Sequence, residues 1–94
     1  MPKLRTFNTQ NEREIWLIEN ADYFTVIYRR DLRNHRLEVP NLKAAREAAR
    51  RISLELKVNT LIYAVSGISD TFVEGVEYTQ QGLRTKYARS NTSL

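Results

Sequence analysis

The chain contains no cysteine and only one histidine, which excludes several kinds of functional site. Without cysteine there is no disulfide scaffold, no thiolate metal site and no cysteine nucleophile, and such a chain suits a reducing compartment. The single histidine, His35, lies between Asn34 and Arg36 next to an expected turn, so we interpret it as a solvated turn residue. We therefore expect neither a metal site nor a catalytic triad.

Recognisable enzyme motifs are missing as well. The glycines Gly67, Gly75 and Gly82 are isolated from one another, so they form no phosphate-binding loop. No serine lies in the context of a nucleophile elbow. Glu74 and Glu77 are expected on opposite faces of one strand, where they cannot act as an acid–base pair. The sequence therefore predicts a protein that is not an enzyme, with no catalytic residues and no cofactor.

Long apolar segments are absent too. No apolar run approaches the roughly 18 residues that cross a membrane. The start of the chain, Met1 to Arg5, is charged but has no apolar segment behind it, unlike a secretory signal. We expect a soluble, cytoplasmic protein without a membrane partner.

What remains is an ordinary globular composition over the length of one small domain, with 41% hydrophobic and 28% charged residues in 94. Apolar periodicity is confined to residues 12–79, which we expect to form a single α+β domain. Residues 1–11 are polar and unpatterned, so we expect a flexible arm. Residues 80–94 are polar and basic, so we expect a disordered basic tail.

The first half of the domain has the pattern of a three-stranded meander. The apolar run Ile15–Ile18, between two glutamates, is typical of a short strand covered on both faces. Tyr23–Arg30 is rich in aromatic and β-branched residues and alternates in polarity, and Arg36–Val39 alternates in the same way. Asp31–Asn34 supplies the turn between these two strands.

A helix and two further strands follow. Asn41 is a favourable N-cap, and the next residues repeat apolar side chains at spacings of three and four as far as Leu56. Thr60–Ser66 predicts a strand covered on both faces. Thr71–Thr79 predicts another, with Phe72 and Glu74 on the same face. The expected order is β-β-β-α-β-β, a mostly antiparallel sheet with one helix packed on one face.

Arginine is the feature that bears on function. The chain has 11 arginines against four lysines, and arginine is favoured where a planar group binds carboxylate or phosphate. Four of them gather around the expected hairpin turn: Arg29, Arg30, Arg33 and Arg36. Such a hairpin could track a phosphate backbone. Equally, charged hairpin ends and edge strands are common because they block edge-to-edge aggregation.

A second group of cations lies on the expected helix. At 100° per residue, Lys43, Arg46 and Arg50 form one basic flank beside the apolar stripe. Two arginines at i,i+4 repel one another slightly, which a helix selected only for stability would avoid. An ordinary solvated face is the alternative. Leu54 falls on the side opposite the stripe, where it could anchor a protein partner or simply be exposed.

Two functional hypotheses follow from these cations. The first is a small non-enzymatic module that binds DNA or RNA, with the seven hairpin and helix cations contacting phosphates. The second is a protein-interaction domain, such as a viral or mobile-element inhibitor or accessory subunit of a host complex. It would use the same arginines against acidic side chains, with Leu54 or Leu32 as the apolar anchor. In outline, the stretch from Tyr23 to Ala49 resembles DNA-reading sheet-plus-helix domains and small antitoxin domains. It lacks their signature residues, so no residue role is transferred.

Overall fold

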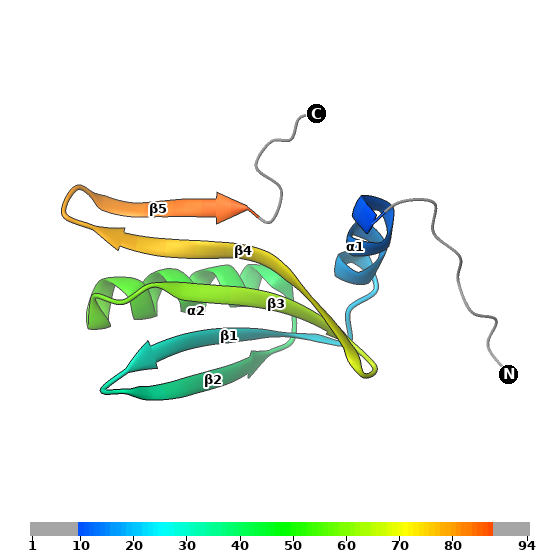
Figure 1. The fold of residues 1–94 in the computed structure, drawn as a ribbon, viewed down its shortest axis with the longest axis horizontal. Coiled ribbons are helices and arrows are strands. Elements are labelled where there is room, and N and C mark those ends of the chain that lie inside the picture. The colour runs from blue at the N-terminus through cyan, green and yellow to red at the C-terminus, as the bar shows by residue number, and fades with distance from the viewer. Residues whose placement is uncertain (1–9, 88–94) are drawn as a thin grey trace, which may run out of the picture.

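In the computed structural model, residues 10–87 are described, and they form two helices and five strands (Figure 1). In chain order these elements are α1 (Gln10–Glu19), β1 (Tyr23–Arg30), β2 (Arg33–Val39), α2 (Leu42–Leu56), β3 (Thr60–Ser66), β4 (Ser69–Thr79) and β5 (Gly82–Tyr87). The fold is α+β, as predicted, with a five-stranded antiparallel sheet.

The sheet has the strand order β2-β1-β3-β4-β5. Hairpins join β1 to β2, β3 to β4 and β4 to β5, whereas β1 and β3 pair only after the chain has passed through α2. In that central pairing Val26 lies opposite Ile62. Both side chains are completely buried, so the core lies under the middle of the sheet.

Helix α2 covers one face of the sheet, behind β3 and β4 in Figure 1. Its N-cap is the predicted Asn41, whose side-chain Oδ1 accepts a hydrogen bond from the backbone N of Ala44 at 2.8 Å. The helix ends at Lys57, which has a left-handed conformation with φ 57°. Small side chains line its inner face, Ala45 and Ala49 being completely buried, so the helix can approach the sheet closely.

Strand alternation assigns each side chain to the helix-covered face or to the opposite, open face. Phe24 and Val26 belong to the core cluster with α2, so Thr25 and Ile27 face the other way. A register shift between Ile62 and Tyr63 leaves an extra residue in β4. Because of this bulge, Phe72 and Glu74 lie on opposite faces, and the sequence-based expectation that they share a face is wrong.

The prediction of one helix is also wrong, because Ile15–Ile18 belongs to α1 and is not a strand. The four apolar residues distribute around the helix: Leu17 is buried, Ile18 packs against the core cluster and Ile15 is exposed. A short apolar run carries no period that separates a buried strand from a helix. Trp16 accepts the hydrogen bonds that end this helix, from the backbone and the side chain of Asn20.

The expected basic tail is in part a strand, β5, which pairs with β4 in register from Thr79–Gly82 to Glu74–Tyr87. Leu83 packs against the core cluster, while Arg84 and Lys86 point to the open face. The prediction of a disordered tail is therefore wrong for 80–87, the turn after β4 and strand β5, and residues 88–94 lie outside the described residues. The predicted arm is likewise outside them for residues 1–9, while α1 begins at Gln10. Across residues 10–87, neither helix has the length and apolar character needed to cross a membrane.

Candidate nucleic-acid interface

The hairpin between β1 and β2 turns through two residues, Asp31 and Leu32. Both have positive φ angles, 54° and 63°, which is the geometry of the tight turn that suits the twist of paired strands. Asparagine and glycine are the usual residues there, because a branched or bulky side chain is strained at positive φ. Leu32 is nevertheless 87% exposed at the end of the hairpin.

Four cations surround this turn on both faces of the hairpin. Arg30 lies directly opposite Arg33 on the helix-covered side, and Arg29 lies opposite Asn34 on the open side. All of these side chains are exposed. Like charges placed directly opposite each other in a sheet are destabilising. Fold stability therefore gives no reason for the Arg30–Arg33 pair.

The acidic neighbours of these cations are few. Arg30 makes a long ion pair with Asp31, at 3.8 Å, and Arg36 makes one with Glu38, at 3.6 Å, both between exposed side chains. Exposed pairs of this kind contribute little to stability and leave the guanidinium available. Within residues 10–87, Arg29 and Arg33 have no acidic partner.

His35 is on β2, on the same face as Arg33, and is not the turn residue that the sequence suggested. Its ring stacks on that of its cross-strand neighbour Tyr28, with centroids 5.0 Å apart and planes 13° from parallel. Arg36, on the open face, donates a hydrogen bond of 3.4 Å to the hydroxyl of Tyr23. The hairpin therefore carries aromatic side chains on both faces, each beside arginine.

The basic flank predicted on α2 divides into two kinds of residue. Arg46 donates from Nε and Nη2 to the same carboxylate oxygen of Glu74 in β4, at 3.1 and 2.8 Å. The side chain of Glu74 is only 5% exposed, whereas that of Arg46 is 49% exposed. Lys43 and Arg50 are exposed and have no acidic partner among residues 10–87.

Helix and hairpin cations do not form one continuous surface. Arg46 reaches β4, which is separated from the hairpin strand β1 by β3 and lies still farther from β2. The basic flank of α2 thus faces the β4 side of the molecule, while Arg29, Arg30, Arg33 and Arg36 lie on the β2 side. The sequence indicated both groups but not their separation, which depends on the order of the strands.

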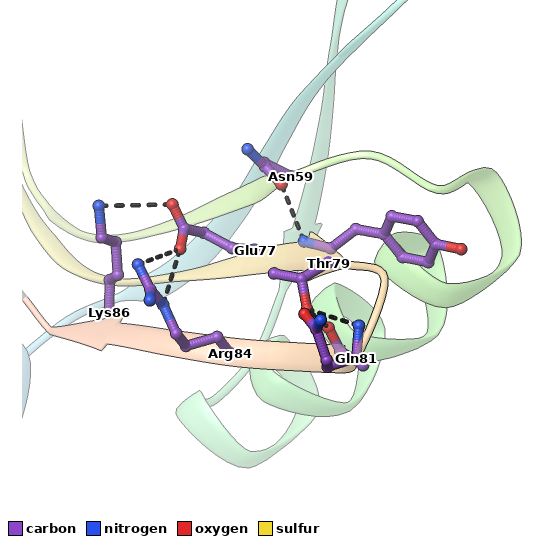
Figure 2. Close-up of polar contacts among 8 residues, drawn as sticks. Asn59, Glu77, Thr79, Gln81, Arg84 and Lys86 are labelled. Carbon is purple, nitrogen blue, oxygen red and sulfur yellow. Dashed lines mark hydrogen bonds and ion pairs between the residues drawn. The ribbon is translucent and has the colours of Figure 1, made fainter.

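Two cations that the sequence placed in a disordered tail belong to the open face of β5 (Figure 2). Arg84 donates from Nε to the carboxylate of Glu77 at 3.0 Å, and Lys86 lies 3.4 Å from the other oxygen of the same carboxylate. The alternating pattern of 82–87 was the available signal for this strand. Because both cations share Glu77, they are partly neutralised within the sheet.

The remaining predicted site residue, Leu54, is 55% exposed on the outer side of α2, as its helical position predicts. No group of three or more histidine, aspartate or glutamate side chains within residues 10–87 could hold a metal ion. Comparison with protein-family models found no match for the chain, and comparisons with curated proteins and with solved structures found none either.

Proposed function

We propose that this protein is a small nucleic-acid-binding module whose β1–β2 hairpin contacts phosphates. The observation that supports it most directly is the opposed pair Arg30 and Arg33, together with Arg29 and Arg36 on the other face. A bound phosphate would relieve the repulsion between opposed guanidinium groups and would accept hydrogen bonds from both. Two-stranded β-ribbons are among the elements that enter DNA grooves.

The helix cations divide their roles in this proposal. Lys43 and Arg50, exposed and without acidic partners among the described residues, add a second and separate set of phosphate contacts. Arg46 chiefly pairs with the buried Glu74, and because its side chain is half exposed it also adds positive charge to this surface of the helix. Either DNA or RNA would supply the phosphates for these contacts, and contacts to phosphates carry no sequence information.

The test is fluorescence anisotropy of a labelled duplex titrated with the full chain at several salt concentrations. Replacing Arg33 with alanine should weaken binding to unrelated sequences by similar factors. It should also reduce the slope of the log binding constant against log salt concentration by about one unit. Arg84→Ala is the matched control, because it removes the same charge from an exposed strand position already paired with Glu77. Its salt slope should stay near that of the unchanged protein.

Two outcomes would contradict the proposal. The first is absence of binding to every duplex and single strand at low salt, where a phosphate-gripping surface binds non-specifically. The second is equal loss of affinity and of salt slope in Arg33→Ala and Arg84→Ala, since this would reflect net charge alone. The alternative hypothesis of a protein partner predicts a different result. Leu54→Ala should abolish partner binding, and neither the unchanged protein nor this variant should bind nucleic acid.

A further inference from the structure

The end of the β1–β2 hairpin combines an exposed apolar side chain with an unfavourable backbone conformation. Leu32 has φ 63° and is 87% exposed, so it gains almost no burial from the fold. Leucine is a poor choice for a left-handed position, where glycine or asparagine would relax the turn. Strained residues that persist without a packing role are expected where the strain serves binding.

The β3–β4 turn at the opposite end of the sheet shows how this chain builds an unstrained turn. There Gly67 takes the positive φ of 62°, and its neighbour Ile68, although fully exposed, is not among the residues with positive φ. The residues around Ile68 are two serines and Asp70, with no cation between Ser66 and Asp70. Exposed apolar turns therefore occur twice, but only Leu32 is strained and surrounded by arginine.

We propose that Leu32 is a wedge that inserts between stacked bases of a DNA duplex while the flanking arginines bind the phosphates on either side. This inference depends on the proposed function and specifies how the hairpin engages its partner. Apolar side chains that enter a base step unstack it and kink the duplex, and leucine is one of the residues used in this way. Arg30 and Arg33 are directly opposite each other behind the turn. With Leu32 inserted, they would contact the phosphates beside the opened step.

Charge favours a duplex over an apolar protein pocket as the site that receives Leu32. A leucine entering a protein pocket would bring Arg29, Arg30 and Arg33 against the pocket rim, and these cations would need a matching acidic ring. A nucleic acid presents apolar base faces between two rows of phosphates, which is the same alternation of apolar and anionic surface. The hairpin therefore matches a duplex without further assumptions about its partner.

The experiment uses the full chain and a duplex of about 20 to 30 base pairs with one central TA step, a flexible step that opens readily. The adenine of that step is replaced by 2-aminopurine, whose fluorescence rises on unstacking, and the duplex ends carry a donor and an acceptor dye. Leu32→Asn removes the wedge and tolerates positive φ. Leu32→Gly repeats the test with a second residue that suits the turn, and Ile68→Asn is the matched control.

The unchanged protein should raise the 2-aminopurine fluorescence and shorten the end-to-end distance of the duplex. Leu32→Asn and Leu32→Gly should lose both signals and bind about tenfold more weakly, which corresponds to about 1.4 kcal/mol, while the salt slope stays the same because the arginines remain. Both variants should unfold at the same or a higher urea concentration. Ile68→Asn should behave like the unchanged protein in every measurement.

These experiments distinguish failure of the wedge proposal from failure of the proposed nucleic-acid binding. Salt-dependent binding without unstacking, or unstacking that survives both Leu32 variants, would overturn the wedge and leave phosphate binding intact. Absence of binding at low salt would overturn both. A crosslinker at position 32 that captures a defined polypeptide, with loss of its affinity in Leu32→Asn and no duplex binding, would assign the leucine to a protein pocket and also overturn the proposal.

Discussion

Glu74 is the only ionisable side chain that is buried among those whose burial the structure describes, and its ion pair with Arg46 joins α2 to β4. A buried carboxylate that loses its partner is costly, because the charge keeps its desolvation penalty without the compensating hydrogen bonds. The sequence placed Arg46 in the basic flank of the helix, among the cations expected to contact phosphates. The pair gives it a structural role that the sequence did not reveal.

We expect Arg46→Ala to lower the free energy of unfolding by about 2 kcal/mol, less than for a fully buried pair because Arg46 is half exposed. Urea denaturation followed by circular dichroism measures this. Arg50→Ala, one turn along the same helix, is the control and should change stability by less than about 0.5 kcal/mol. Adding Glu74→Gln to Arg46→Ala should recover part of the loss, because a neutral amide is cheaper to bury. Equal effects of Arg46→Ala and Arg50→Ala would contradict a structural role for the pair.

At the scale of elements, the orientation of α2 on the sheet gives neighbouring residues of the helix very different burial. Ala49 is completely buried in the core cluster, whereas Arg50 is exposed. Ala49→Asp should therefore cost several kcal/mol, since it buries a charge with no partner and no space. A denaturation midpoint for Ala49→Asp close to that of Arg50→Ala would show that the helix is rotated relative to the sheet.

Strand β5 carries the second prediction at this scale. Leu83 packs against the core cluster from β5, so Leu83→Ala should lower stability by about 1 to 2 kcal/mol, below the range for fully buried leucines. Leu54→Ala, which shortens an exposed leucine on α2, is the control and should have little effect. Deletion of residues 80–94 should destabilise more than Leu83→Ala, because β4 then also loses its hydrogen-bonded neighbour. A deletion as stable as the full chain would show that β5 adds nothing to the fold.

Local patterns were enough to predict some elements and not others. Tyr23–Arg30 and Thr60–Ser66 were predicted with the bounds that the structure has, because their residues alternate and turn residues flank them. Ile15–Ile18 is too short to show a period, so α1 was mistaken for a strand. In β4 the bulge at Val73 reverses the alternation, and a bulge depends on the partner strand rather than on the bulged residues.

In the candidate site, too, the features that are local in sequence could be predicted and those that depend on distant residues could not. The arginines around the hairpin turn are local in sequence, so their clustering could be read directly. The pairing of Arg46 with Glu74 joins positions 28 residues apart, and no local pattern indicates it. The strain at Leu32 was hidden because the turn was expected to span Asp31–Asn34, whereas β2 begins at Arg33 and leaves only two residues for it.

At the scale of the whole molecule, the strand order places β1, β3 and β4 in the interior and leaves β2 and β5 at the edges. Almost every residue of β2 is exposed. Amides whose hydrogen bonds are flanked by strands on both sides exchange only when a large part of the structure opens. Native-state hydrogen exchange should therefore show the slowest amides in the interior strands β1, β3 and β4 and faster exchange throughout β2. Uniform protection across the sheet would contradict this order of stability.

The late pairing of β1 with β3 also has a consequence for the nascent chain. The β1–β2 hairpin can close as soon as both strands have been synthesised, but the other edge of β1 has no neighbour until β3 follows α2. At about 5 to 20 residues per second, the stretch between Arg30 and Thr60 takes roughly 1.5 to 6 s to synthesise. During that interval the backbone edge of β1 is uncovered, and so is the inner face of α2 once residues 42–56 have been synthesised. Charged side chains discourage edge-to-edge pairing, so the arginines at the end of the hairpin should also keep this unfinished edge from pairing with a neighbouring chain until β3 has been synthesised.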